Sequence, residues 1–374
     1  MTKNTSERLA RLRFPLIVLA ILSLLAAIWA GWIRIGWPWP PGQPLWIALH
    51  GPLMVSGFLG TLISLERAVA LLPRTKERPG ASAALLAAPA LSGLGSLLLI
   101  LGVTGWLPLA LIAAGSLLLL AMMIYVARLH TALYTIVMAI GAGCWLGGNL
   151  LWLGGWPVYR VVPLWAAFLV LTIAGERLEL GRILRLSRLK TGLFAALVGL
   201  ILLGLIGSLV NFDLGMRLTG LGFLGLAAWL LWNDIARKTI HQSGLPRFIA
   251  ACLLSGFVWL GVGGLFYMAY GGVAAGLYYD AALHAIFLGF VMAMIFAHAP
   301  IVFPAVLGRP IRYSPFSYVY LALLNLSLLM RLMGDLQADF TLRRWGGLLN
   351  GIAILLFLGS TAVSLLRKPP AGIE

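Results

Sequence analysis

The feature that most constrains this chain is a series of apolar runs, each about 20 residues long, which follow one another over almost its whole length. In a bilayer the backbone polar groups must be satisfied within the segment, and a run of this length achieves that as an α-helix. We expect twelve such spans, at residues 14–35, 44–72, 82–104, 107–128, 130–153, 159–180, 191–211, 217–236, 248–270, 278–305, 315–334 and 345–366. The sequence therefore predicts an all-α polytopic membrane protein, with a single twelve-span transmembrane domain over residues 1–374.

The basic residues are divided unevenly between the two sides that these spans define. Of the 27 Lys and Arg residues, 21 fall on the side of the N-terminus and six on the other. Cytoplasmic segments of membrane proteins are enriched in Lys and Arg, so we expect both termini in the cytoplasm, as short tails over residues 1–13 and 367–374. Topology thus accounts for the net charge of +16. Membrane lipids are the expected partners, and nucleic acid is not.

The five histidines fall at different predicted depths. His50 and His284 lie near the outer ends of the second and tenth spans, and His298 lies near the inner end of the tenth. His130 begins the fifth span at the inner surface, whereas His241 belongs to a charged inner loop. Ionisable residues within a membrane are costly, so each buried histidine marks a candidate functional site. The alternative is that each imidazole simply hydrogen-bonds a backbone carbonyl.

The spacing of the two histidines in the tenth span predicts two sites. His284 and His298 are 14 residues apart, which places them near one helix face and about 21 Å from each other along the axis. One metal ion cannot contact both. We therefore expect His50 to pair with His284 toward the outside, and His298 to pair with His130 toward the inside, as a second metal or proton site. An imidazole pair on facing helices suits haem iron, which takes axial histidines, and copper is a second candidate.

Small residues near the first pair leave room for a large ring. Gly57 follows His50 in the second span, and Gly289 follows His284 in the tenth. We expect both glycines beside the cofactor, although small residues also serve plain helix packing in membranes.

The two propionates of a b-type haem would lie at the outer surface, where planar guanidinium groups suit carboxylates. The arginines on that side are Arg34, Arg160, Arg331, Arg343 and Arg344. Of these, Arg343 and Arg344 are the candidate cofactor-binding residues.

Two acidic residues lie near the predicted outer site. Asp280 precedes His284 by one helical turn, so it either hydrogen-bonds the imidazole and fixes its tautomer or meets water at the helix start. Asp335 and Arg331 are expected to form an i, i+4 ion pair. 

At the inner helix ends, Glu66 and Glu176 each precede an arginine, which predicts either ion pairs or a route for proton uptake. Cys144 and Cys252 lie in apolar segments without a CxxC motif, so buried structural thiols are expected.

The sequences around the outer histidines, "ALHGPLMVSGF" (48–58) and "ALHAIFLGFVMAMIF" (282–296), resemble a known family. They are similar to subunit I of the haem-copper oxidase superfamily, in which histidines of the second and tenth of twelve helices hold a low-spin haem. Within that superfamily the chain resembles the NnrS family, bacterial membrane proteins linked to nitric oxide stress and containing haem and copper. The likeness is carried by His50, Gly57, Phe58, His284, Gly289, Met294 and the string LGR (307–309).

The resemblance implies three arcs of four helices, a low-spin haem b with two histidine ligands, possible copper, and a place in the bacterial cytoplasmic (inner) membrane. Two departures limit it. Spans 159–180 and 191–211 contain no histidine, and the tenth span has one outer histidine where an oxidase has two. An oxidase-type binuclear centre is therefore not expected. NnrS proteins usually carry a further histidine two positions after the first, where this chain has Pro52.

Three functions follow from these features. The first is a haem b protein of NnrS type, which exchanges electrons with an unidentified donor or acceptor or acts in nitric oxide handling. The second is a secondary transporter that couples transport to protons through His and Glu; it predicts broken helices near the membrane centre. The third is a membrane protein that binds copper alone. Catalysis is not the leading expectation, although a haem-dependent oxidoreductase stays open.

Overall fold

The structure, a computed structural model, describes residues 3–75, 79–184, 186–307 and 312–366. Within these ranges the regular secondary structure is entirely helical, and no β-strand occurs. Twelve helices of the described part are long and apolar enough to cross a membrane. The chain is therefore a multi-pass membrane protein, as its apolar runs predict. The predicted C-terminal tail, residues 367–374, lies outside the described residues, as does the start of the N-terminal tail.

Ten spans are single helices, and two are composite. The single ones are α1 (Lys3–Arg34), α4 (Pro79–Ile100), α5 (Trp106–Leu129), α6 (Leu133–Leu153), α7 (Val158–Leu180), α8 (Arg188–Val210), α9 (Phe212–Asn233), α11 (Gly244–Tyr270), α14 (Ser317–Gln337) and α15 (Phe340–Leu366). Short helical turns follow three spans: η2 (Leu72–Thr75), η3 (Gly181–Leu184) and α10 (Ala236–Thr239).

The second and tenth spans are the composite ones, and each contains a π-helical segment. The second consists of α2 (Trp46–Pro52), the π-helix η1 (Leu53–Gly60) and α3 (Thr61–Leu71). The tenth consists of α12 (Leu277–His284), the π-helix η4 (Ala285–Met292) and α13 (Ala293–Leu307). Each span had been expected as one continuous helix, and each remains helical from end to end.

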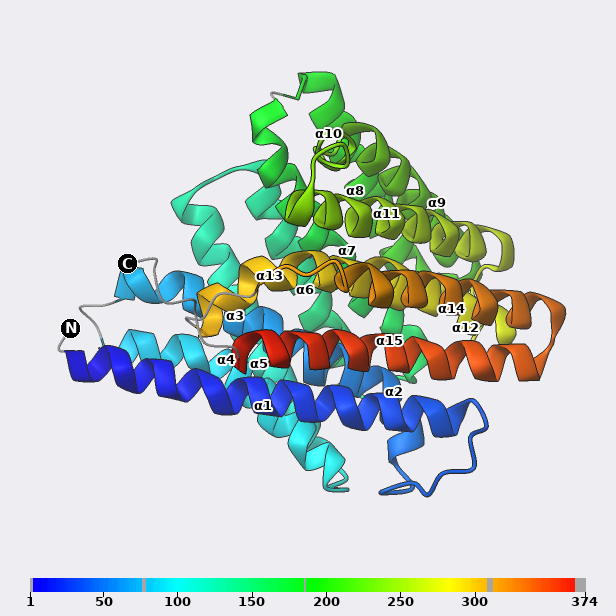
Figure 1. The fold of residues 1–374 in the computed structure, drawn as a ribbon, viewed down its shortest axis with the longest axis horizontal. Helices are drawn as coiled ribbons and strands as arrows, with labels where there is room; N and C mark the ends of the chain where they lie inside the picture. Colours follow the sequence, from blue (N-terminus) through cyan, green and yellow to red (C-terminus); the bar gives the residue numbers. More distant parts are fainter. Residues whose placement is uncertain (1–2, 76–78, 185, 308–311, 367–374) are drawn as a thin grey trace.

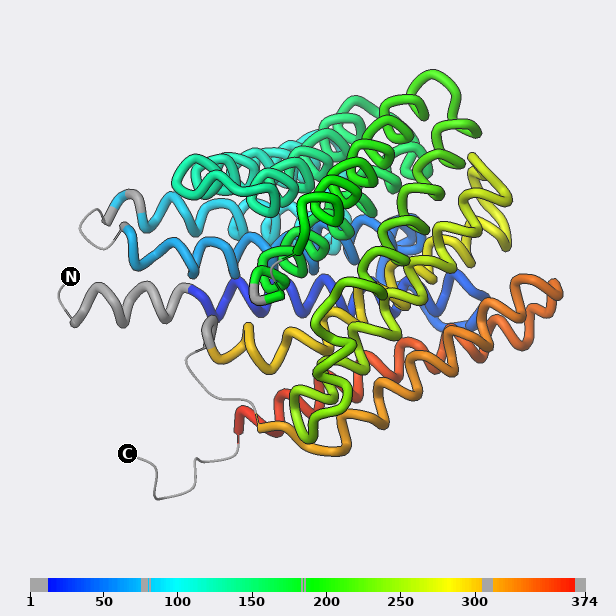
Figure 2. The backbone as a smooth tube through the Cα atoms, turned by 90° about the horizontal axis from the view of Figure 1, so that it is seen from above, coloured from blue at the N-terminus to red at the C-terminus, as the bar shows by residue number. Residues whose placement is uncertain are grey.

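The helices lie side by side with their long axes roughly aligned, and the first span begins on the side of the bundle where the last one ends (Figures 1 and 2). Helices α1 and α15, from opposite ends of the chain, are neighbours and close one side of the bundle. The grouping of the twelve spans into three arcs stays a prediction.

Close approach between helices depends on glycine. Helices α9 and α11 meet at Gly220 and Gly264, and a Cβ atom on either residue would lie 2.6 to 2.7 Å from the carbonyl oxygen of the other. Such contacts allow backbones to pack tightly where lipid provides no hydrophobic drive for helix association. The outward face of α8 is apolar and exposed, as at Leu203, Ile206 and Val210, because it faces the hydrocarbon.

Several polar side chains inside the bundle pair across helices. Arg177 of α7 binds Asp234 through two hydrogen bonds of 2.8 Å, and both side chains are almost fully buried. Near the centre, Trp165 donates to the Asn149 side-chain oxygen at 3.0 Å, and Ser56 of η1 donates to the same oxygen at 3.3 Å. These bonds hold the π-segment of the second span against α6 and α7.

Candidate functional site

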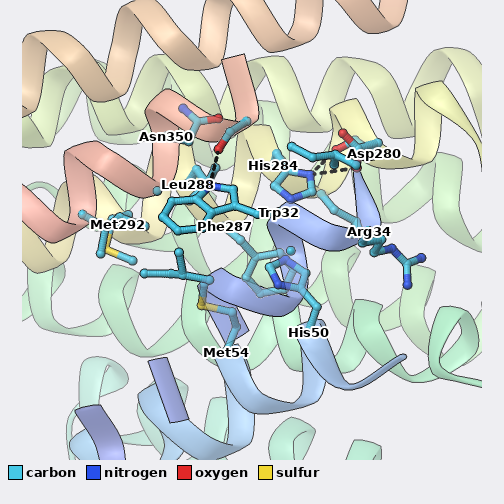
Figure 3. A pocket seen from close by; sticks show the side chains of 18 of the residues that line it. Trp32, Arg34, His50, Met54, Asp280, His284, Phe287, Leu288, Met292 and Asn350 are labelled. Atoms are coloured by element: carbon cyan, nitrogen blue, oxygen red, sulfur yellow. Dashed lines mark hydrogen bonds and ion pairs between the residues drawn. The ribbon is translucent and has the colours of Figure 1, made fainter. Parts of the chain in front are cut away.

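His50 and His284 face each other across a cavity (Figure 3). His50 lies in α2, and His284 is the last residue of α12. Their ring centroids are 6.2 Å apart and their ring planes differ by 20°. Two imidazoles that bind one metal ion from opposite sides, each at about 2 Å, have ring centroids about 6 Å apart. The separation therefore fits a single metal ion held between the rings.

The hydrogen bonds of both rings leave the same nitrogen free. His50 Nδ1 lies 2.7 Å from the carbonyl oxygen of Ala27, and His284 Nδ1 lies 2.8 Å from that of Asp280. A carbonyl oxygen only accepts, so each Nδ1 carries the proton and donates it. Each Nε2 then keeps its lone pair, which is the state in which a neutral imidazole binds a metal. Each imidazole thus also forms the hydrogen bond to a backbone carbonyl that was the alternative interpretation from the sequence. This bond supports ligation, because it leaves Nε2 free.

A π-helical segment follows each of these histidines closely. It begins three residues after His50 and one residue after His284. An inserted π-turn redirects the side chains that follow it, and such turns are frequent at functional sites. Pro52 at the start of the first segment is a sequence signal for disturbed helical bonding. The second segment has no proline, and the sequence analysis predicted neither segment.

The histidine-pair cavity, defined as the space around His50 and His284, contains about 960 Å³ of empty volume, part of it open to the outside. Its walls are mainly apolar, and glycines widen it, namely Gly31, Gly51, Gly347 and Gly351. A Cβ atom on Gly31 would lie 2.8 Å from His50 Cε1, and one on Gly351 would lie 2.5 Å from the Trp32 ring. Gly51 directly follows His50 in the second span, whereas sequence reasoning missed Gly31, Gly347 and Gly351 because they come from the first and last spans.

The glycines that were expected at the cofactor do not line this cavity. A Cβ atom on Gly57 would lie 2.8 Å from Ser23 of α1, and one on Gly289 would collide with Trp259 of α11. Both residues therefore serve helix packing, which was the alternative interpretation. They still hold the two π-segments in place, since each lies inside one.

A buried charge network supports His284. The Asp280 carboxylate accepts two hydrogen bonds from Arg331, at 2.8 and 2.9 Å, and lies 3.2 Å from Arg343. It also lies 3.4 Å from His284 Nδ1. Asp280 thus acts next to the imidazole, through its backbone carbonyl and its carboxylate, rather than simply meeting water.

The expected pair of Arg331 with Asp335 is wrong. Arg331 reaches across to Asp280, while Asp335 pairs with Arg343 at 2.7 Å. The reason is that α12 packs against α14, and this brings the Asp280 carboxylate within the reach of the Arg331 guanidinium.

Neither of the two arginines expected at the cofactor lines the cavity. Arg343 is held by Asp280 and Asp335, and Arg344 lies over the Trp37 ring at 5.0 Å. Arg34 lines the cavity instead and is exposed, with one long hydrogen bond of 3.4 Å to a backbone carbonyl. It was among the outer arginines of the sequence, but its depth gave no reason to prefer it.

A second cavity lies at the other end of the tenth span. The His298 cavity has about 640 Å³ of empty volume, and its titratable lining residues are His298, Glu66 and Glu176. His298 Nδ1 lies 2.8 Å from the Met294 carbonyl oxygen, so its Nε2 is free as well. Glu176 forms an ion pair with Arg67. The interhelical ion pair expected for these acids is thus confirmed for Glu176, while Glu66 faces the cavity.

His298 and His130 are not brought together. His130 lines a different cavity, between α3, α5, α6 and α7, with its ring 5.8 Å from that of Tyr134. The Arg67–Glu176 ion pair joins α3 to α7 between the two cavities, because Arg67 lines one and Glu176 lines the other. 

Three further expectations concern residues away from these cavities. His241 is exposed at the end of a short turn. Cys144 and Cys252 are buried free thiols, as expected. Gly308 and Arg309 of the string LGR lie outside the described residues.

Within the ranges that the structure describes, no group of three or more His, Cys, Asp or Glu side chains is arranged to hold a metal ion. The histidine pair consequently offers two ligands only. A metal bound there needs further ligands from a cofactor, such as the four nitrogens of a porphyrin, or from softer groups such as methionine sulfur.

Comparison with known families gives one match. A family described as a domain of unknown function (DUF8744) matches residues 13–366, and the chain belongs to this family. No curated protein matches the chain.

Proposed function

We propose that this member of the DUF8744 family is a haem b-binding membrane protein of NnrS type, acting in electron transfer or the nitric oxide stress response. In this proposal His50 and His284 ligate the iron from opposite faces. The observation that carries it is the pair of opposed imidazoles, 6.2 Å apart between centroids, each with Nδ1 bound to a backbone carbonyl. A bacterial inner-membrane location, with both termini in the cytoplasm, is part of the same proposal.

The residues around the pair suit a large ring with an acidic edge. Gly31 and Gly351 leave space where any other side chain would touch His50 or Trp32. Arg34 offers a guanidinium at the cavity lining for a propionate, and a planar guanidinium binds carboxylates well. The charge on Asp280 is already matched by arginines, so the carboxylate does not repel an anionic cofactor strongly.

The ligand set favours electron transfer over turnover. Bound haem supplies a one-electron Fe(III)/Fe(II) couple. His50 and His284 would both hold the iron, and this would leave no ligand position for a substrate. In addition, α7 and α8 contain no histidine, so these helices provide no histidine for an oxidase-type second metal.

Copper alone is a second candidate, and one observation favours it. Met54 and Met292 line the same cavity as the histidine pair, and thioether with imidazole suits copper(I). The cavity is larger than one ion requires, and the glycines in its lining leave further space. Both features favour haem. The transporter alternative predicts broken helices, whereas both composite spans stay helical.

A reduced-minus-oxidised optical spectrum of the purified protein, with metal analysis of the same sample, tests the proposal. We expect the sharp bands of a low-spin b haem and about one iron per chain. His50→Ala and His284→Ala should each abolish those bands. His241→Ala is the matched control, because His241 is exposed and far along the chain from both spans, and it should leave the spectrum unchanged.

Two results would overturn the assignment. Bound copper without iron would favour the copper protein, and haem bands that persist in both His50→Ala and His284→Ala would place the haem elsewhere. 

A further inference from the structure

A third cavity lies at the ends of α3, α5 and α7, beside the start of α6. It has about 1,030 Å³ of empty volume, and its charged residues are Arg67, Arg74, Arg182 and Glu179. His130 lies on its rim and is exposed. We call this space the arginine cavity. It is distinct from the histidine-pair cavity, and its interpretation requires no haem.

The three arginines of this cavity differ in how their charge is used. Arg67 forms an ion pair with Glu176 of α7. Arg182 donates a hydrogen bond of 3.0 Å to the Tyr134 hydroxyl, and its guanidinium lies 5.3 Å from the centre of that ring. Arg74 is exposed and has no ion pair within the described ranges. Arg74 and Arg182 therefore keep a positive charge available for an anion from outside the chain.

The opposite wall of the arginine cavity is apolar. Met122, Met123, Val126 and Leu129 of α5 form it, and Leu129 is 54% exposed. Tyr125, one helical turn before Leu129 on the same helix, is 48% exposed, so the apolar wall continues into a surface that faces the hydrocarbon. A soluble anion would use the guanidinium groups and leave this wall uncovered. A ligand with a charged head and apolar chains would cover both.

We infer that the arginine cavity binds an anionic phospholipid. Its phosphate lies between Arg74 and Arg182, and its acyl chains run along α5 over Val126 and Leu129. Guanidinium groups bind phosphate oxygens with directed, charge-assisted hydrogen bonds. Basic pockets between helices on the cytoplasmic side are typical sites for anionic lipid headgroups, and the Lys and Arg distribution predicts that this end is cytoplasmic.

The test is a titration of the full-length protein in detergent, followed by native mass spectrometry. The probes are phosphatidylglycerol and, at the same acyl composition, phosphatidylcholine. We expect phosphatidylglycerol to bind more tightly. The double variant Arg74→Gln, Arg182→Gln should bind it about thirty-fold more weakly, at about 1 kcal/mol per arginine and 1.4 kcal/mol per tenfold.

Arg128→Gln is the matched control. Arg128 is an exposed arginine at the same end of α5 but does not line the cavity, so removing it lowers the local charge without touching the site. Its affinity for phosphatidylglycerol should stay close to that of the wild type. Circular dichroism checks that all variants keep their helix content, and Arg182→Lys should restore only part of the affinity because it lacks the planar fork.

Three outcomes would overturn the inference. The first is equal binding of the anionic and the zwitterionic lipid. The second is an equal loss in Arg128→Gln and in the double variant, which would indicate general surface electrostatics. The third is displacement of the lipid by millimolar inorganic phosphate, which would indicate a site for a soluble anion instead.

Discussion

The histidine-pair cavity and the His298 cavity both have walls from the second and tenth spans, yet they offer different chemistry. In both, a histidine of the tenth span donates Nδ1–H to the carbonyl four residues earlier, His284 to Asp280 and His298 to Met294. The second span supplies the opposite wall in each case. It contributes an imidazole, His50, to one cavity and a carboxylate, Glu66, to the other.

This difference shows that the local geometry of a membrane histidine does not decide its role. A free Nε2 beside another free Nε2 is a ligand pair, because both groups offer lone pairs and neither carries charge. A free Nε2 beside carboxylates instead brings together groups that can each accept a proton, which suits proton exchange better than a pair of metal ligands. Leu59 lines both cavities and lies between them.

The largest contrast is expected between the two histidines of the tenth span. His284→Gly should remove the haem bands, since one axial ligand is lost, whereas His298→Gly should retain them. Optical spectra of the two variants, normalised to protein, measure this. Added imidazole should restore the bands in His284→Gly, because the substitution leaves a cavity of the shape of the missing ring. Loss of haem in His298→Gly alone would reverse the roles of the two cavities.

The next contrast concerns charge. Asp280→Asn leaves Arg331 without its carboxylate partner inside the bundle, while Arg343 keeps Asp335. Removal of one partner from a buried pair typically costs about 3–5 kcal/mol. We expect a clearly lower unfolding temperature in detergent and reduced haem content. Asp213→Asn removes the carboxylate of an exposed i, i+4 pair with Arg217, and it should leave the unfolding temperature unchanged. Similar losses in both variants would argue against a special role for the Asp280 network.

A smaller effect is expected from one methyl group. In Gly31→Ala the new Cβ would lie 2.8 Å from His50 Cε1, so the ring must turn away from the Ala27 carbonyl. Haem occupancy should fall several-fold while the fold is retained. Gly199→Ala is the control, because a Cβ at that helical position meets nothing within 4 Å. An unchanged haem content in Gly31→Ala would show that the His50 ring has freedom to move.

The sequence predicts the spans and the first histidine pair because both depend on local rules. A helix must be about 20 residues long to cross the bilayer, and a histidine near the same end of two spans is at the same depth. The other residues that line the histidine-pair cavity depend on contacts between distant segments. Trp32 donates to the Gly347 carbonyl, 315 positions away, and no local pattern indicates which glycine of α15 faces α1.

The expected partner of His298 failed for the same reason. Depth alone placed His130 and His298 at one level, but depth does not say which side of α3 a residue occupies. The Arg67–Glu176 ion pair joins α3 to α7 between the two cavities. In the sequence it was one of several possible ion pairs. The two π-segments are a further case, since they depend on how Gly57 and Gly289 pack against other helices.

The smallest expected effect distinguishes the two carboxylates of the His298 cavity. Glu176→Gln breaks the ion pair with Arg67, whose two side chains are 19% and 21% exposed, and partly exposed pairs of this kind contribute about 1 kcal/mol or less. Glu66→Gln breaks no ion pair within the described part of the chain, so the unfolding temperature should stay at the wild-type value. Thermal unfolding of the two single variants and the double variant measures this. If Glu66→Gln is the more costly change, Glu66 is a structural acid, and the His298 cavity is closer in kind to the charge network around Asp280 than to a site for proton exchange.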